Sequence, residues 1–250
     1  MPTLLAALDN SAACTPVIRM AKVLAPILGA GVEAVHVAEN GFDTAEASAR
    51  AADVPFRAVR GDPLGELLGL VGDSGVVGAA IGVRGLPGSH RVPGHLMLQL
   101  ADQCGKPLLA VPPESHIPDE LHRVLIAMEG TASRPRRLNH ALELVNALGL
   151  EVIVVHVNDE DAIPSFSDQV QHETDAYADA FLGRYARGLQ RSQLELRIGD
   201  PAREILAVAD ERDVDLVAMG WPSGAGPGRG LIARAVLQHN HVPTLLVPLR

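Results

Sequence analysis

The sequence predicts an α/β protein built from two tandem, doubly wound domains, each with a five-stranded parallel sheet. One observation is an internal repeat: GDPLGELL at residues 61–68 returns as GDPAREIL at residues 199–206. The other is that short apolar runs alternate with helix-length stretches, which is the pattern of a parallel sheet covered by helices. Because several flanking segments repeat in the same order, the two halves are predicted to share one fold.

The elements of each half follow from apolar runs bounded by Gly, Pro or Asp, which are typical of buried parallel strands. In the first half they predict strands near residues 3–8, 32–38, 55–59, 76–81 and 107–111, with helices near 12–29, 63–73 and 94–104. The second half predicts matching strands near 122–128, 151–157, 194–198, 215–219 and 243–247. Prolines between 112 and 118 can continue neither structure, so we place a boundary between domains 1–114 and 115–250.

The halves differ after their second strands. The second half carries about 18 additional residues there, and apolar side chains at helical spacing predict an amphipathic helix near 165–187. The first half has only an alanine-rich stretch at residues 43–52. We therefore expect thin cover on that part of the first sheet and another surface packed against it, such as a second copy of the chain.

Composition limits the function. A formal charge of −9 disfavours binding to nucleic acid or anionic membranes, which reward clustered Lys and Arg. Because the sequence has no transmembrane-length apolar run and no signal-like start, we expect a cytoplasmic protein. Cys14 and Cys104 are expected to be buried free thiols. None of the ten histidines stands at a recognisable metal-ligand spacing, so no metal site is predicted.

Three repeated features resemble the universal stress protein family, and the likeness covers the whole chain. An acidic residue, Asp9 or Glu129, follows the first strand, and His36 or His156 lies between valines on the second. A glycine-rich loop follows the fourth strand in each half. The resemblance implies the strand order 3-2-1-4-5, pairing of the two domains through their last strands as an intrachain pseudo-dimer, and binding of ATP, with Mg, by members that keep the full glycine pattern.

The glycine loops depart from the family pattern in both halves. In the first half, Gly82 and Gly85 are followed by Gly94, but His95 stands where the family has Ser or Thr. A neutral imidazole donates from one nitrogen only, so phosphate binding would be altered. In the second half the loop is three residues shorter than the family pattern, Ser223 stands in place of the second glycine, and Leu231 occupies the Ser or Thr position. The first half is therefore the better nucleotide-binding candidate.

In a sheet of order 3-2-1-4-5, a crevice opens where strands 1 and 4 send their helices to opposite faces. Glycines let the backbone approach phosphates, and the following helix points free N–H groups at an anion. An acidic group near phosphates would repel them, so we assign it to the base or ribose. The resemblance places these nucleotide-binding residues in the first half: Asp9, Val37, Gly82, Arg84, Gly85, Gly94 and His95.

Plainer interpretations stay open. Asp9 could only cap the following helix together with Asn10 and Ser11, and the glycine loop could simply form a tight turn. His36 and His156 are expected to be core histidines bonded to a carbonyl. Trp221 could plug the second crevice, stack on a base or meet a partner.

The sequence leaves two functions and predicts no enzyme beyond weak ATP hydrolysis. The first is a stress-response protein that binds an adenine nucleotide in its first domain. The alternative is a degenerate scaffold that binds no nucleotide and acts through protein partners or another small ligand.

Overall fold

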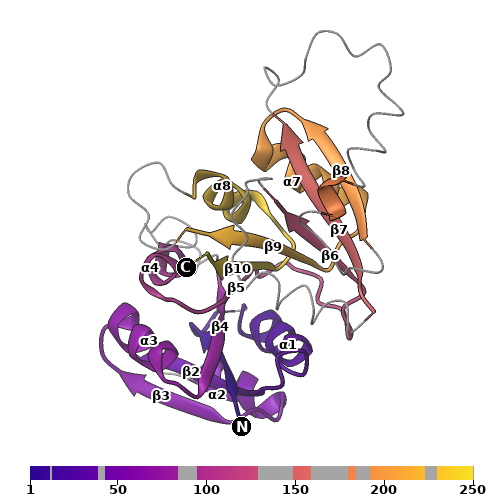
Figure 1. Cartoon of the computed structure of the whole chain (residues 1–250). Helices are drawn as coiled ribbons and strands as arrows, with labels where there is room; N and C mark the ends of the chain where they lie inside the picture. The colour runs from indigo at the N-terminus through magenta and orange to yellow at the C-terminus, as the bar shows by residue number, and fades with distance from the viewer. Residues whose placement is uncertain are drawn as a thin grey trace, which may run out of the picture.

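A computed structural model describes residues 1–11, 13–38, 43–83, 95–128, 149–158, 180–183, 192–222 and 230–249. Its strands form one ten-stranded sheet in the order β3-β2-β1-β4-β5-β10-β9-β6-β7-β8 (Figure 1). The first half supplies β1 (Thr3–Leu8), β2 (Gly31–Ala38), β3 (Phe56–Arg60), β4 (Val76–Gly82) and β5 (Leu108–Val111). The second supplies β6 (Arg123–Ala127), β7 (Glu151–Asn158), β8 (Ser192–Ile198), β9 (Leu216–Trp221) and β10 (Thr244–Pro248).

This topology confirms the predicted fold class. Within each half the strands are parallel and follow the order 3-2-1-4-5, because β8-β7-β6-β9-β10 repeats β3-β2-β1-β4-β5. The halves meet where β5 and β10 pair antiparallel, with Leu109 opposite Leu245 and Leu108 opposite Leu246. We call this pairing of β5 with β10 the seam. It covers an edge of each half-sheet that would otherwise expose unpaired backbone groups.

Helices cover both faces of the sheet (Figure 1). They are α1 (Cys14–Leu24), α2 (Asp43–Ala51), α3 (Pro63–Gly72), α4 (His95–Gln103), α7 (Pro201–Glu211) and α8 (Leu231–His239). Alternate residues of a strand point to opposite faces. Leu108 of β5 accordingly joins a core with residues of α3, α4, α7 and α8, while Leu109 joins one with residues of α1 and α2. Both cores contain residues of both halves, so the seam lies inside continuous packing.

The repeated Gly-Asp-Pro motif is a helix start. Asp62 precedes α3 and its carboxylate accepts a hydrogen bond from Gly65 N at 2.8 Å, and Asp200 does the same for Arg203 N at 2.9 Å before α7. Proline follows each Asp at the first helical position, where its missing N–H costs nothing. The clearest sequence repeat therefore has a local structural cause.

The prediction of a helix over residues 12–29 was too long. The helix α1 ends at Leu24, and residues 25–29 form turns. Pro26 has no N–H with which to continue the helical ladder, and Gly29 adopts a left-handed φ of +60°.

The alanine-rich stretch after β2 forms α2, which buries Ala45 and Ala49. A groove of about 1000 Å³ lies between α1 and α2 and is bounded by Pro118 and Asp119. The additional helix predicted near 165–187 falls almost wholly outside the described residues. Within 180–183, Phe181 is buried, and its ring centroid lies 4.9 Å from that of His156.

The segment between β5 and β6 crosses from one half to the other, burying Ile117 and Leu121. Ser115 donates a hydrogen bond to His241 O at 2.7 Å, and Arg19 of α1 donates to Ile117 O at 3.0 Å. The predicted domain boundary after residue 114 lies in this segment and stays a prediction. No helix among the described residues is long and apolar enough to cross a membrane.

Candidate functional site

The strand register brings three predicted binding residues to one edge of the first half-sheet. The last pair between β1 and β2 is Leu8 with His36, and the next residues along these strands are Asp9 and Val37. The last pair between β1 and β4 is Ala7 with Ile81, and Gly82 is the next residue on β4. Carboxyl ends of parallel strands lie at the same edge, and β1 and β4 are neighbours at the switch point. We call Asp9, Val37 and Gly82 the first rim.

Asp9 is exposed, and a turn holds its carboxylate. Its Oδ1 accepts hydrogen bonds from Ser11 N at 3.0 Å and from Ser11 Oγ at 2.5 Å. Ser11 Oγ in turn accepts from Ala13 N at 3.1 Å, just before α1. The capping interpretation is therefore wrong for Asp9, because the N-cap of α1 is Ala13 and no side chain makes a capping bond there. Asp9 Oδ2 accepts no hydrogen bond from the described residues.

Gly82 lets α1 approach the end of β4. A Cβ at this position would lie 3.4 Å from Ala13 Cβ and 3.8 Å from Val17 Cγ2. A single Cβ would therefore make ordinary van der Waals contacts, whereas a bulkier side chain would displace α1 whether or not a ligand binds there. Gly82 is a poor probe of nucleotide binding for this reason.

The remaining predicted site residues belong to the loop between β4 and α4. Arg84, Gly85 and Gly94 lie outside the described residues, so their placement stays a prediction. His95 is the exposed first residue of α4. Because α4 follows β4, its N-terminus faces the same edge of the sheet as the first rim.

The two strand histidines are structural, as predicted. His36 Nδ1 lies 2.7 Å from Leu8 O, and His156 Nδ1 lies 2.9 Å from Met128 O. Each imidazole therefore links the second strand of its half to the end of the first. In the first half this bond fixes β1 just before Asp9.

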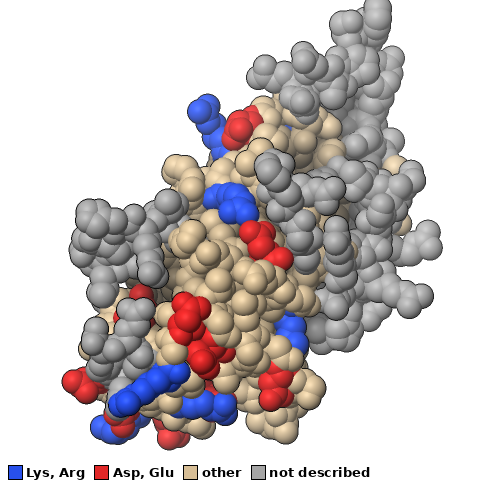
Figure 2. All heavy atoms as spheres, turned by 90° about the vertical axis from the view of Figure 1, so that its left-hand side faces the viewer, with Lys and Arg blue, Asp and Glu red and all other residues tan. Residues whose placement is uncertain are grey.

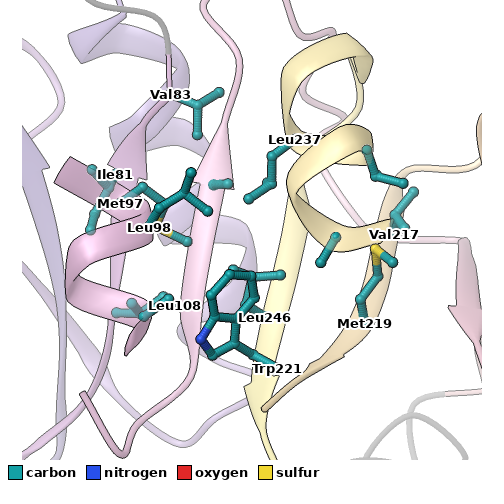
Figure 3. Packing of buried hydrophobic residues seen from close by; sticks show 14 of the residues in the cluster. Ile81, Val83, Met97, Leu98, Leu108, Val217, Met219, Trp221, Leu237 and Leu246 are labelled. Atoms are coloured by element: carbon teal, nitrogen blue, oxygen red, sulfur yellow. The ribbon is translucent and has the colours of Figure 1, made fainter. Parts of the chain in front are cut away.

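The second half differs at the position after its fourth-strand glycine. There Trp221 stands where the first half has Val83, and its side chain is 1% exposed. Figure 3 shows the indole at the seam, among buried residues of β5, β9 and β10. Gly230, which precedes α8 with a left-handed φ of +67°, packs on the ring, since a Cβ there would lie 3.1 Å from Trp221 Cζ3. The indole thus fills the space between β9 and the start of α8, and the interpretation of that space as a lost nucleotide crevice stays a prediction.

Arg234 connects this plug to the first half. Its guanidinium carbon lies 5.2 Å from the Trp221 ring centroid, and its Nη2 lies 3.1 Å from Asp102 Oδ2 on α4. The indole Nε1 is buried and has no hydrogen-bond partner among the described residues. A buried N–H without a partner is unfavourable, so packing of the ring must outweigh that cost. No pattern in the sequence predicts this contact, because it requires the two halves to be packed together.

The described residues around the first rim offer one carboxylate and no metal cluster. No group of three or more His, Cys, Asp or Glu in the described part of the chain could hold a metal ion. Beneath the rim, burial raises the pKa of the Cys14 thiol above its ordinary value of 9.0, and the Asp9 carboxylate adds to the rise. Figure 2 shows acidic and basic side chains interspersed over one described face, without a patch of one sign.

The topology defines a doubly wound α/β protein with one switch point in each half, where β1 meets β4 and where β6 meets β9. Residues 120–248, just over half of the chain, match the model of the universal stress protein family. The chain therefore belongs to the universal stress protein family.

Two solved structures match over nearly the whole chain. A universal stress protein from Archaeoglobus fulgidus is 18% identical with a TM-score of 0.66, and the match covers 99% of this chain and 98% of that chain. A functionally unknown protein from Pseudomonas aeruginosa is 12% identical with a TM-score of 0.69, covering 100% of this chain and 93% of that one. At these identities the likeness shows the fold alone. The comparison with curated proteins finds no match.

Proposed function

We propose that this chain is a tandem universal stress protein of the cytoplasm whose first half binds one adenine nucleotide, as a magnesium complex, without robust catalysis. The observation that carries the proposal is the difference between the two crevices. In the second, Trp221 fills the space before α8, whereas the first has Val83 at that position and an exposed Asp9 beside it. The first half also keeps all three loop glycines in its sequence, Gly82, Gly85 and Gly94.

The first rim divides the ligand into two ends. Asp9 Oδ2, directed by the bonds that Ser11 makes to Oδ1, accepts a hydrogen bond from the base or the ribose. The phosphates lie toward the N-terminus of α4, where an anion gains about 0.3–1 kcal/mol per exposed charge. Arg84, Gly85 and Gly94 belong to this phosphate end by their sequence positions, with His95 as a donor in place of a hydroxyl.

The proposal is one of binding because the described rim has no group positioned to activate water. Asp9 is assigned to the base end, away from the phosphates, so hydrolysis would be weak at most. The alternative is a scaffold without nucleotide, which acts through a protein partner, a second copy of the chain or another small ligand. The altered His95 position and the plugged second crevice favour that alternative if the first crevice is also inactive.

Calorimetric titration with Mg-ATP tests the proposal, together with a check of denatured protein for co-purified nucleotide. We expect saturation near one site per chain. An Asp9→Asn variant should bind about tenfold to a hundredfold more weakly, since a hydrogen bond to a charged group contributes about 1.5–3 kcal/mol. The matched control is Glu129→Gln, which changes the corresponding position of the plugged half and should leave affinity unchanged. If the native protein gives no heat on titration and carries no bound nucleotide, nucleotide binding is refuted and the scaffold is favoured.

A further inference from the structure

The turn that holds Asp9 also holds a helix 35 residues away. Asn10 lies between Asp9 and Ser11 with a left-handed φ of +63°. Its side-chain Oδ1 accepts a hydrogen bond from Ala45 N, in the first turn of α2, at 2.9 Å. First-turn N–H groups have no partner within their own helix, so Asn10 acts for α2 as a cap supplied from another segment.

The helix α2 depends on such contacts because its own packing is slight. It is nine residues long, shorter than the length at which isolated helices become stable, and buries only Ala45 and Ala49. Its far end is held by a second polar bond, from Lys22 Nζ of α1 to Ala52 O at 2.9 Å. Among the described residues, two buried alanines and these two polar bonds attach α2 to α1 and to the turn after β1.

This arrangement matters for the first rim because α2 follows β2, which carries Val37. Asp9 and Val37 lie on neighbouring strands, and the same three-residue turn presents the Asp9 carboxylate and fixes the start of α2. A ligand that orders the turn would therefore order α2, and loss of the Asn10 bond would loosen the first turn of α2, which lines the groove beside α1.

We propose that Asn10 is a positioning residue that couples nucleotide binding at the first rim to the ordering of α2, and with it the wall of the groove between α1 and α2. This coupling rests on the proposed function. The hydrogen bond by which Asn10 holds α2 does not rest on the proposed function, so this bond and the coupling to nucleotide can be measured separately.

The test compares hydrogen exchange of the amides of residues 43–52 and Mg-ATP affinity in three proteins: native, Asn10→Gly and Lys22→Met. Glycine adopts the left-handed turn readily and removes the side chain that carries the amide group. Loss of a cap of this kind should speed exchange of Ala45 N–H by about twofold to thirtyfold. We expect Asn10→Gly also to weaken Mg-ATP binding severalfold, whereas Lys22→Met, which removes the bond at the far end of α2, should leave affinity unchanged. Saturating Mg-ATP should slow exchange at Ala45 in the native protein and not in Asn10→Gly.

Each outcome is decisive. Unchanged exchange at Ala45 in Asn10→Gly would overturn the positioning role. The coupling would be overturned if Asn10→Gly exchanged faster at Ala45 but bound Mg-ATP with native affinity. It would also be overturned if Lys22→Met lost as much affinity as Asn10→Gly. If the native protein binds no Mg-ATP, the proposed function and the coupling fail together, and the exchange rates without nucleotide still decide whether Asn10 holds α2.

Discussion

Replacing Trp221 by alanine tests whether the indole is a packed plug. The side chain is 1% exposed, and removing a buried Trp typically costs about 3–5 kcal/mol. Losing the Arg234 contact over the ring adds about 0.5–1 kcal/mol. Removing the buried Nε1–H, which has no partner among the described residues, offsets about 1–3 kcal/mol. The expected net destabilisation of Trp221→Ala is therefore about 3 kcal/mol.

Trp221→Phe separates the ring from its N–H. Phenylalanine keeps most of the apolar contact and removes the unpaired donor, so we expect a change within about 1 kcal/mol of zero. Urea unfolding followed by far-UV circular dichroism measures both variants without relying on the fluorescence of the sole tryptophan. A cost below about 1 kcal/mol for Trp221→Ala would mean that the ring fills no packed space. Equal costs for the two variants would mean that Nε1–H has a partner in the folded protein.

Three further outcomes follow from local geometry. Gly230→Ala should lower the free energy of unfolding in urea by at least about 1–2 kcal/mol, because φ is +67° and the Cβ would lie 3.1 Å from the indole. Gly69→Ala is the control: its Cβ would meet open space inside α3, so it should raise that free energy by about 0.5–1 kcal/mol. The Cys14 thiol should react with maleimide only after unfolding, and fast labelling of the native thiol would contradict its burial. Because burial raises the pKa of the folded thiol above 9.0, the contribution of Cys14 to stability should decrease as the pH rises above that value. A double-mutant cycle on Asp102 and Arg234 should give a coupling of about 0.2–1 kcal/mol that falls with salt, and no coupling would show that the pair does not join the halves.

Most strands could be predicted from sequence because they are buried apolar runs with clear boundaries. The two outermost strands, β3 and β8, have no buried residue and carry charged side chains. The strand order and the pairing of the last strands came from the family resemblance, and the structure has both. The end of α1 was missed although Pro26 was visible, because the apolar periodicity continues beyond it through residues 27 and 28. Periodicity reports which side chains could face a core, whereas the proline decides where the helical hydrogen bonds end.

The first rim was predictable in part. Asp9, Val37 and Gly82 lie at one edge because each ends a parallel strand, and strand ends can be read from the sequence. Asn10 and Arg234 could not be assigned roles in this way. The Asn10 bond joins segments 35 residues apart, and the Arg234 ion pair forms across the seam, at a separation of 132 residues. Such side-chain bonds depend on the final packing of helices, which periodicity does not specify.

The plug also suggests how one half could give up a ligand and stay folded. A ligand present at about 100 times its dissociation constant stabilises its folded domain by about 2.7 kcal/mol. The net contribution worked out above for the Trp221 ring, about 3 kcal/mol, is of that size and does not depend on ligand concentration. Because both cores run through the seam, this constant stabilisation in the second half also supports the first. The first half can then bind and release a nucleotide without its folding depending on occupancy. If so, adding Mg-ATP should shift the unfolding of native protein and of Trp221→Ala by the same free energy, and a shift confined to one of them would contradict this division of roles.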